Sequence, residues 1–259
     1  EDISEKNEVI SQGEYQIIQF HPAYSYEDFV RGIVAETDDN GNISYNVENK
    51  VLADFAKKAQ EDPNGKYVLI IDEINRANLP SVLGELIYAL EYRGEPVVSM
   101  YEYGNSGREI ILPKNLYIIG TMNTADRSVG HIDYAIRRRF AFVEVLPEKL
   151  EDNDEIFFNT SDFIDVAKLF IRVGEDQVLD FEKAENSDFL SDDFSAKDVA
   201  LGHSYFIADK KKISEDKKQE YFNMKMKYEV IPILNEYLKD GVFNEKATVK
   251  IKEIEQRFA

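Results

Sequence analysis

The chain has 259 residues, of which 43% are hydrophobic and 31% charged, a composition that supports a sizeable core in one or two domains and excludes a disordered chain. It contains no cysteine, which excludes a disulfide framework and a thiolate metal site. The net charge of −19 disfavours broad electrostatic binding of DNA by this chain alone. No apolar run approaches the ~20 residues of a membrane span and no leader pattern opens the sequence, so we expect a cytoplasmic protein.

Local patterns before residue 67 predict a strand, two helices and a hairpin. Residues 15–20 are rich in β-branched and aromatic side chains, as is typical of a strand. Ser25 is suited to cap a short helix, and the Asp-Asp-Asn-Gly-Asn run at 38–42 predicts the tip of a hairpin. Apolar side chains at helical spacing predict a helix over 47–61, which the Asp-Pro-Asn-Gly run at 62–65 ends.

Two continuous apolar runs predict buried parallel strands. They cover residues 67–71 and 116–120, and a run without alternation is typical of a strand covered on both faces. Between them, residues 80–92 have the apolar stripe of an amphipathic helix. Residues 94–112 predict a hairpin insertion around a glycine-containing turn.

The last part of the chain changes from alternating to helical patterns. Residues 133–139 predict a short helix and residues 140–145 a further strand, and after Pro147 the pattern is mostly helical. Strands that alternate with helices and are followed by a helical tail predict two domains. We expect an α/β core with a parallel sheet over residues 1–147 and a small α-helical domain over residues 148–259.

Two carboxylates, Asp72 and Glu73, follow the first buried strand. The carboxyl edge of an open parallel sheet is where ligands bind, and phosphoryl transfer needs a carboxylate for Mg²⁺ and a group that orients the attacking water. Asp72 suits the metal role and Glu73 the water-polarising role. Acids that cap a strand and face solvent are the simpler interpretation of this motif alone.

Asn123 and Asp126 follow the second buried strand in the same way. An asparagine at a strand tip can hydrogen-bond both a water and a γ-phosphate oxygen, and Asp126 is suited to help hold the same water. A turn is the alternative, since Asn and Asp are common turn residues. A turn does not explain why these residues follow a strand in register with the first.

Arg137, Arg138 and Arg139 are adjacent and precede the last predicted strand. Arginine stabilises charge on a transferring phosphoryl group, either within its own subunit or from a neighbouring one. An isolated triplet of this kind is more often a solvated basic cluster. Because this one follows the two other motifs, we favour the functional interpretation.

Together these motifs resemble McrB-like AAA+ nucleotide triphosphatases, the motor subunits of modification-dependent restriction systems. The resemblance is carried by the runs at 72–78, 116–127 and 133–140. The Met-Asn-Thr-Ala-Asp-Arg run at 122–127 is the most specific part of it. The resemblance extends to three further segments. Residues 20–29 are similar to a segment of the family's α/β domain, and residues 201–206 and 227–237 are similar to its helical lid.

The resemblance implies a fold and a set of roles. The fold is the AAA+ αβα core with a parallel sheet, followed by a helical lid. The implied roles fall on residues already singled out: Asp72 as the Walker B metal and cofactor ligand, Asn123 at the sensor-1 position for cofactor binding, and Glu73, Asn123, Asp126, Arg138 and Arg139 for catalysis. Arg138 and Arg139 match positions from which a finger reaches the nucleotide of the neighbouring subunit.

The histidines have smaller roles. His203 lies in the lid segment and has a supporting cofactor-binding role, although a lone histidine among Tyr and Phe is more often a packing residue. His21 and His131 are expected to be structural. Three scattered histidines in a chain without cysteine do not predict a histidine-rich metal site.

The resemblance also implies cofactors and partners. Members of the family use Mg²⁺ and GTP or ATP, assemble as homo-oligomeric, hexameric rings, and work with an McrC-like nuclease in restricting DNA that contains 5-methylcytosine. We therefore expect hydrolysis to drive translocation or cleavage of DNA. The alternatives are a non-catalytic ring or scaffold subunit and another AAA+ remodelling ATPase, such as a MoxR-like chaperone.

The phosphate-binding P-loop of the family is absent. The only Gly-Lys pair, Gly65-Lys66, lacks the upstream glycine of the G-x-x-x-x-G-K-[ST] pattern, so a phosphate-rich ligand loses most of its donors. We expect a fragment that hydrolyses nucleotide negligibly by itself, because a degenerate subunit has no evident reason to keep the other motifs.

The strand before the P-loop, normally central in the sheet, should be missing as well. The sheet should then either close around the gap or expose strand edges that favour self-association.

Overall fold

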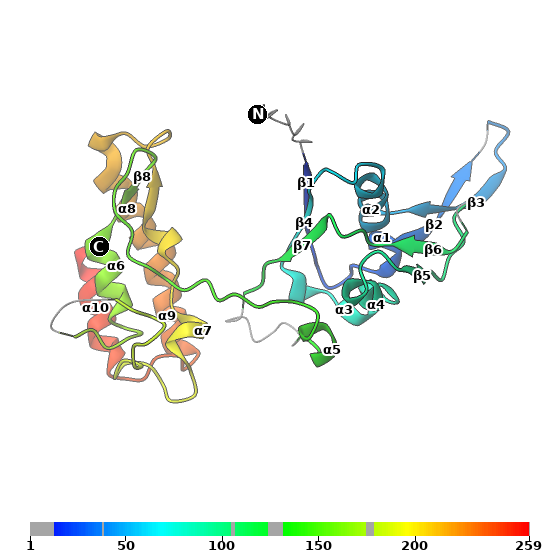
Figure 1. The fold of residues 1–259 in the computed structure, drawn as a ribbon. Helices are drawn as coiled ribbons and strands as arrows, with labels where there is room; N and C mark the ends of the chain where they lie inside the picture. The colour runs from blue at the N-terminus through cyan, green and yellow to red at the C-terminus, as the bar shows by residue number, and fades with distance from the viewer. Residues whose placement is uncertain (1–12, 38, 105–106, 124–131, 175–178, 259) are drawn as a thin grey trace, which may run out of the picture. The chain divides into compact units, whose positions relative to one another are not determined.

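The structure, a computed structural model, describes residues 13–37, 39–104, 107–123, 132–174 and 179–258. The chain divides into two compact units, Glu1–Phe142 and Val143–Ala259 (Figure 1). Each unit has a hydrophobic core of its own. In the described part of the chain, no helix has the length and hydropathy needed to cross a membrane.

The first unit is built on a three-stranded parallel sheet. The strands β1 (Glu14–Gln19), β4 (Tyr67–Asp72) and β7 (Leu116–Gly120) lie in the order β1-β4-β7. Each strand pairs with the next in parallel register, so their carboxyl ends meet at one edge of the sheet. This parallel sheet confirms the α/β fold class predicted from the apolar runs.

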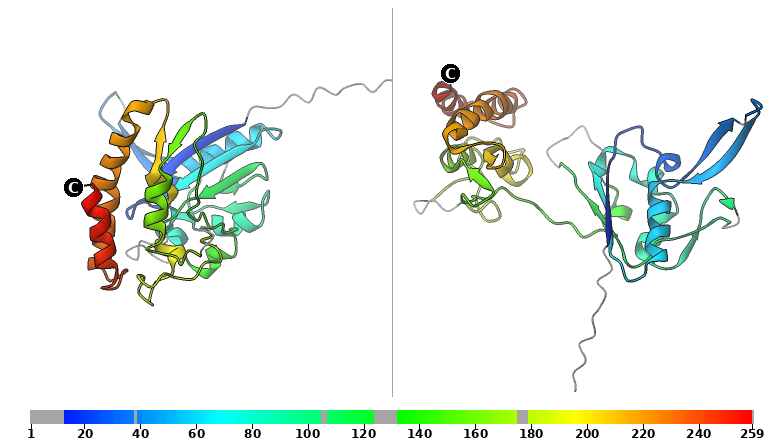
Figure 2. Two further views of the ribbon diagram at one scale, coloured as in Figure 1. Left: turned by 90° about the vertical axis from the view of Figure 1, so that its left-hand side faces the viewer. Right: turned by 90° about the horizontal axis from the view of Figure 1, so that it is seen from above.

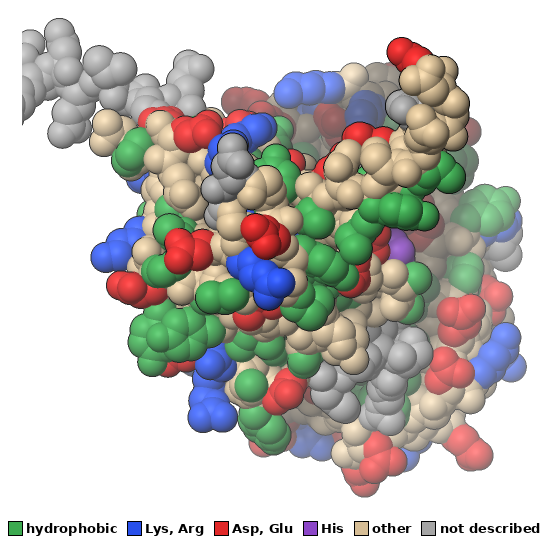
Figure 3. Space-filling view, turned by 90° about the vertical axis from the view of Figure 1, so that its right-hand side faces the viewer, with side chains coloured by type: hydrophobic (Ala, Val, Ile, Leu, Met, Phe, Trp, Pro, Cys, Tyr) green, Lys and Arg blue, Asp and Glu red, His purple; other side chains and the backbone are tan. Residues whose placement is uncertain are grey.

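Short helices and two hairpins connect the strands. The helices are α1 (Tyr26–Phe29), α2 (Val51–Glu61), α3 (Leu79–Leu83), α4 (Leu86–Glu91) and α5 (Tyr134–Arg137), with a 3₁₀ turn, η1, at Ile74–Arg76. The hairpins are β2 (Arg31–Thr37) with β3 (Ile43–Asn49), and β5 (Pro96–Val98) with β6 (Glu109–Ile111). Figure 2 shows the β2–β3 hairpin projecting from the body of this unit. On the hairpin side of the unit, hydrophobic side chains reach the surface between charged ones (Figure 3).

Several local predictions in this unit are confirmed. Ser25 caps α1, because its side chain accepts from the backbone of Asp28 while the Asp28 carboxylate accepts from the Ser25 backbone. The two hairpins lie where turn residues predict them, at the run 38–42 and within 94–112.

The two faces of the parallel sheet differ in burial. Leu69, Ile71 and Leu116 are at most 2% exposed and belong to the main core with the helices. On the opposite face, four apolar side chains are 50 to 70% exposed: Tyr15, Ile17, Tyr117 and Ile119. We call these four residues the open face. The strand β7, expected to be covered on both sides, is therefore covered on one, whereas Val68 and Ile70 of the central strand β4 are half-buried on the same face.

Two predicted helices have different bounds in the structure. Residues 47–49 belong to β3 instead of the next helix, because Val47 pairs with Ile33 across the hairpin. The helix expected over 80–92 is divided into α3 and α4 at Gly84. The φ of 51° at Gly84 is a conformation that glycine adopts readily and other residues do not.

The strand predicted over 140–145 is not formed, and this prediction is wrong for the described structure. Val143 and Val145 are 83% and 87% exposed. A strand requires the backbone of a neighbouring strand, and the apolar alternation of this segment cannot supply one.

The second unit is mostly helical, as predicted, but it also contains a small two-stranded sheet whose strands are far apart in the sequence. Its helices are α6 (Thr160–Ala167), α7 (Ala196–Val199), α8 (Lys218–Lys225), α9 (Ile231–Lys239) and α10 (Ala247–Arg257), with shorter turns η3 (His203–Phe206), η4 (Glu215–Lys217) and the π-helical η5 (Met226–Val230). The strands β8 (Ile156–Phe158) and β9 (Ile207–Asp209) pair antiparallel. Phe170, Leu234 and Ile251 are fully buried in the core of this unit.

Candidate active site

The carboxyl ends of β1, β4 and β7 bring three polar side chains together at Asp72. Its Oδ1 accepts a hydrogen bond from Thr121 Oγ1 at 2.6 Å, and its Oδ2 accepts one from Gln19 Nε2 at 3.0 Å. Both donors are uncharged, so they orient the carboxylate without neutralising it, and each oxygen retains capacity for another donor. The arrangement suits contact with a hydrated Mg²⁺ through its waters.

Glu73 follows in a left-handed backbone conformation, with φ 54° and ψ 44°. It is the one non-glycine residue with positive φ in the described ranges. Such a conformation costs about 1–3 kcal/mol and persists where surrounding contacts impose it. Glu73 Oε2 lies 3.1 Å from Arg76 Nε in an ion pair, although the two atoms do not meet in hydrogen-bond geometry. The carboxylate next to Asp72 is therefore held by an arginine of its own turn.

Thr121 joins β7 to the turn after β4, a role that sequence analysis did not identify. Its backbone N donates to Ile71 O and its backbone O accepts from Ile74 N, both at 2.9 Å. Its hydroxyl also lies 3.4 Å from Glu73 N, which donates to it. The available signal was its place directly after the second buried strand, at the edge of the sheet that also carries Asp72.

Gly120, the last residue of β7, allows this close approach. A Cβ at this position would lie 2.7 Å from Ile74 Cδ1, closer than packed carbon atoms approach. Asn123 lies two residues beyond Thr121, on the segment that leaves the same edge of the sheet. Asp126 lies outside the described residues, so its place beside Asn123 stays a prediction.

The three adjacent arginines lie in three different environments. Arg137 stacks over Phe142, with 5.0 Å between the guanidinium carbon and the ring centroid. Arg138 is exposed, and its Nε donates to Tyr134 O at 3.4 Å. Arg139 is 21% exposed, and its Nη2 lies 3.0 Å from Glu91 Oε2 in an ion pair. The structure thus separates Arg138 from Arg139, which the sequence treats alike.

His203 lies in the second unit, in the 3₁₀ turn η3. Its Nδ1 accepts a hydrogen bond from Glu148 N at 3.3 Å. This contact links two segments of the same unit and agrees with a packing role. A contact of His203 with nucleotide stays a prediction.

The Gly65-Lys66 pair lies at the wrong edge of the sheet to replace a P-loop. It immediately precedes β4, whereas Asp72 is the last residue of that strand. A six-residue strand spans about 17–20 Å, so the pair lies at the amino edge, opposite the candidate site. In the described residues no group of three or more His, Cys, Asp or Glu side chains could hold a metal by itself.

A pocket of about 410 Å³ lies on the loop that follows Glu73. Its lining includes Asn75, Arg76 and Asn78 from that loop, and Asp133 from the N-terminal end of α5. The pocket therefore lies between the segment after Glu73 and the N-terminal end of α5, the helix that precedes Arg138 and Arg139.

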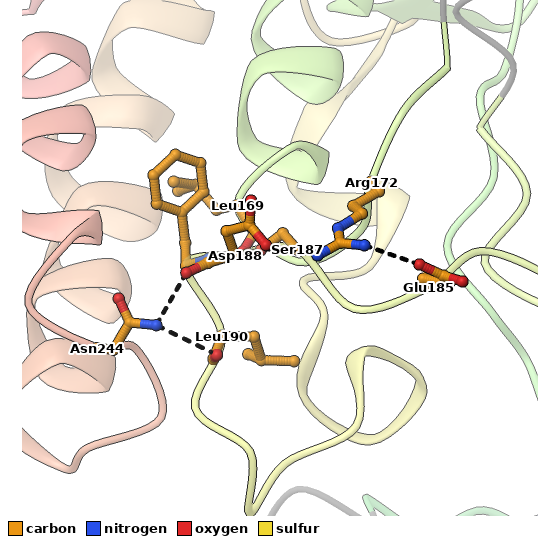
Figure 4. Close-up of polar contacts among 8 residues, drawn as sticks. Leu169, Arg172, Glu185, Ser187, Asp188, Leu190 and Asn244 are labelled. Atoms are coloured by element: carbon orange, nitrogen blue, oxygen red, sulfur yellow. Dashed lines mark hydrogen bonds and ion pairs between the residues drawn. The ribbon is translucent and has the colours of Figure 1, made fainter.

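A second pocket, of about 490 Å³, lies in the second unit and is polar. Arg172 pairs there with Glu185 at 2.8 Å and with Asp188 at 2.6 Å. Asn244 Nδ2 donates to the carbonyl oxygens of Asp188 and Leu190 at 2.9 and 3.3 Å (Figure 4). These charges pair with one another, and none of the predicted site residues lines this pocket.

The chain is similar to components of two bacterial restriction enzymes. It is 33% identical over 235 residues to the type IV methyl-directed restriction enzyme EcoKMcrB subunit of Escherichia coli, covering 89% of this chain and 48% of that protein. It is 30% identical over 223 residues to the type II restriction enzyme BsuMI component YdiS of Bacillus subtilis, covering 80% of this chain and 58% of that protein. The chain spans about half the length of the curated relatives it matches.

Family models match both units of the chain. Residues 3–140 match the AAA domain of the dynein-related subfamily, which includes the parallel sheet, Asp72, Glu73 and the arginines. Residues 187–245 match the α-helical lid domain of McrB. The chain therefore belongs to the AAA domain family, dynein-related subfamily, and carries the helical lid of McrB proteins.

Proposed function

We propose that this chain is the hydrolytic half of an McrB-like AAA+ nucleotide triphosphatase. The observation that carries the proposal is the junction at Asp72, whose two oxygens accept from Thr121 and Gln19 at the carboxyl ends of the flanking strands. Glu73 follows at once, and Asn123 leaves the same edge. Phosphoryl transfer needs such a set at one place: a carboxylate for the metal, a group that acts on water, and a polar contact to the γ-phosphate.

Each side chain has a proposed role in hydrolysis. Asp72 holds Mg²⁺ through its waters, and Glu73 polarises the attacking water. Asn123, with Asp126, orients that water and a γ-phosphate oxygen. An arginine of the neighbouring subunit stabilises the charge that develops on the transferring group, which is the role proposed for Arg138 and Arg139.

The cofactors are Mg²⁺ and either GTP or ATP. Mg²⁺, when bound, would neutralise part of the phosphate charge of the nucleotide. The phosphate cradle has to come from polypeptide outside these residues, because Gly65-Lys66 lies at the opposite edge of the sheet. The match covers only 48% of the E. coli relative, which supports this.

The proposed setting is a cytoplasmic restriction system. Both similar proteins are components of restriction enzymes, and the AAA domain and McrB lid occur together in this chain. We propose a homo-oligomeric ring, a hexamer, that works with an McrC-like nuclease on DNA containing 5-methylcytosine. With a net charge of −19, contact with DNA is expected through the assembled complex more than through this chain.

The test is steady-state hydrolysis of GTP and of ATP by the full-length protein that contains this chain. Glu73→Gln is expected to lower kcat at least about a hundredfold, as for loss of a general base, while nucleotide binding is retained. Glu102→Gln, a charge loss at an exposed position in the β5–β6 hairpin region, is the matched control and should leave the rate unchanged. An unchanged rate in Glu73→Gln contradicts the proposal, and a protein that binds neither nucleotide is instead a non-catalytic ring subunit.

A further inference from the structure

The arginine helix α5 is attached to α4 by one ion pair. Arg139 Nη2 lies 3.0 Å from Glu91 Oε2, and the Arg139 side chain is 21% exposed. The other terminal nitrogen of Arg139 donates to Ala135 O, and its Nε is buried without a hydrogen-bond partner in the described structure. Arg139 is therefore turned into its own unit and held there.

Arg138 has the opposite character. It is exposed, and in the described part of the chain its guanidinium makes one hydrogen bond, to Tyr134 O at 3.4 Å. Ile136, on the same short helix, is 1% exposed in the main core. With Ile136 and Arg139 directed inward, the helix presents Arg138 outward.

The end of α4 is itself fixed to the sheet. Arg93 donates to Leu90 O at 3.3 Å and to Leu116 O at 3.2 Å, at the beginning of β7. Leu116 begins the strand whose far end leads to Thr121. Contacts therefore run without interruption from β7 through Arg93 and α4 to Glu91, and from Glu91 to Arg139.

We propose that Glu91 is a positioning residue, which holds Arg139 so that Arg138 of the same subunit is directed toward the nucleotide of the neighbouring subunit. This inference rests on the proposed function. The two arginines then have different roles. Arg138 contacts the transferring phosphoryl group, and Arg139 anchors the segment to Glu91 within its own subunit. Glu91 acts through its ion pair with Arg139 and not by contact with the nucleotide.

The first measurement is hydrolysis by the full-length protein with Glu91→Gln. A misplacement of about 1 Å in a reacting group costs up to about a hundredfold in rate, so kcat is expected to fall about ten- to a hundredfold with little change in KM. Glu95→Gln, an equal charge loss four residues along the chain at an exposed position beyond the end of α4, should retain the wild-type rate. A wild-type rate in Glu91→Gln overturns the inference.

The decisive measurement mixes variants within one ring. Glu91→Gln subunits keep their own Asp72 and Glu73, and Glu73→Gln subunits keep well-positioned arginines. Equal amounts of the two should hydrolyse faster than either alone, because some interfaces combine an intact site with an intact arginine pair. If Glu91 acts on its own subunit's site or on folding, the mixture shows no gain, and the inference fails.

A parallel mixture separates this failure from failure of the proposed function. Arg138→Ala with Glu73→Gln should also gain activity if the arginine acts across the interface. Gain in this mixture without gain in the Glu91→Gln mixture overturns the role of Glu91 alone. If neither mixture gains activity, the proposal that an arginine of one subunit completes the site of its neighbour is wrong.

A second pair of variants keeps the test decisive should Glu91→Gln fail to fold. Arg139→Lys keeps a cation opposite Glu91, whereas Arg139→Gln does not. Arg139→Lys is expected to retain more of the rate, and equal losses contradict the pairing.

Discussion

At the residue scale, the carboxylate of Asp72 depends on two neighbours that are not charged. Thr121 and Gln19 each occupy one of its oxygens, and they come from different strands. The orientation of Asp72 is therefore a property of the sheet and not of its own strand. Thr121 contributes more than Gln19 to this orientation, because its backbone also forms hydrogen bonds with Ile71 and Ile74.

Thr121→Val should lower both stability and turnover. Valine has nearly the shape of threonine but cannot donate to Asp72, and a hydrogen bond to a charged acceptor at a partly exposed site contributes about 1–2 kcal/mol. Urea unfolding of this chain should shift by about that amount, and kcat of the full-length protein should fall about tenfold. Thr121→Ser keeps the hydroxyl and should behave as wild type, so equal effects of Val and Ser would refute a role for the hydrogen bond.

At the scale of elements, the three strands of the parallel sheet pair with one another, but apolar side chains on one of its faces are exposed. The open face presents Tyr15, Ile17, Tyr117 and Ile119, and β7 is an edge strand in the described sheet. The predicted strand at 140–145 has no partner there. An apolar surface next to an unpaired edge favours association with another chain.

The isolated chain should self-associate through the open face. Replacing both Tyr117 and Ile119 with Lys should shift sedimentation velocity profiles toward monomer, because like charges at this surface repel between copies. The matched control replaces Ile43 and Tyr45 of the β2–β3 hairpin with Lys, since these side chains are 62% and 72% exposed. Equal shifts in both double variants would mean that general hydrophobicity, and not this face, causes association.

At the scale of the whole molecule, the chain contains the AAA core matched over residues 3–140 and an McrB lid but no phosphate cradle. The candidate site carries the residues proposed for metal, water and a neighbouring nucleotide, but the sequence holds no G-x-x-x-x-G-K-[ST] pattern to form the backbone nest that binds the β- and γ-phosphates. Under the proposed function, binding and hydrolysis of nucleotide require a phosphate cradle from outside these residues.

The 259-residue chain alone should hydrolyse GTP and ATP negligibly. Phosphate release measured at high protein concentration should remain at the level of the Glu73→Gln variant of the same chain. The full-length protein, assayed beside it, should turn over at a rate that Glu73→Gln abolishes. Robust turnover by the isolated chain that is lost in Glu73→Gln would refute the need for an external cradle.

Local patterns predicted the strands that position the site, because β4 and β7 are continuous apolar runs that end in polar residues. The same patterns failed where structure depends on distant partners. Residues 140–145 have the composition of a strand, but a strand forms only against another backbone. Gly84 divides the helix expected over 80–92 because its φ is positive, and the spacing of apolar side chains does not reveal this backbone conformation.

By itself, the sequence determined the family, the parallel sheet, the lid and the order of the acidic, amide and arginine groups along the chain. These follow from short-range patterns and from motifs that occupy adjacent positions. Only the tertiary structure decided that Thr121 and Gln19 hold Asp72, that Arg139 pairs with Glu91 while Arg138 faces outward, and that one face of the sheet is uncovered. Each of these is a contact, or the lack of one, between segments far apart in the chain, and its geometry depends on packing that no local pattern encodes.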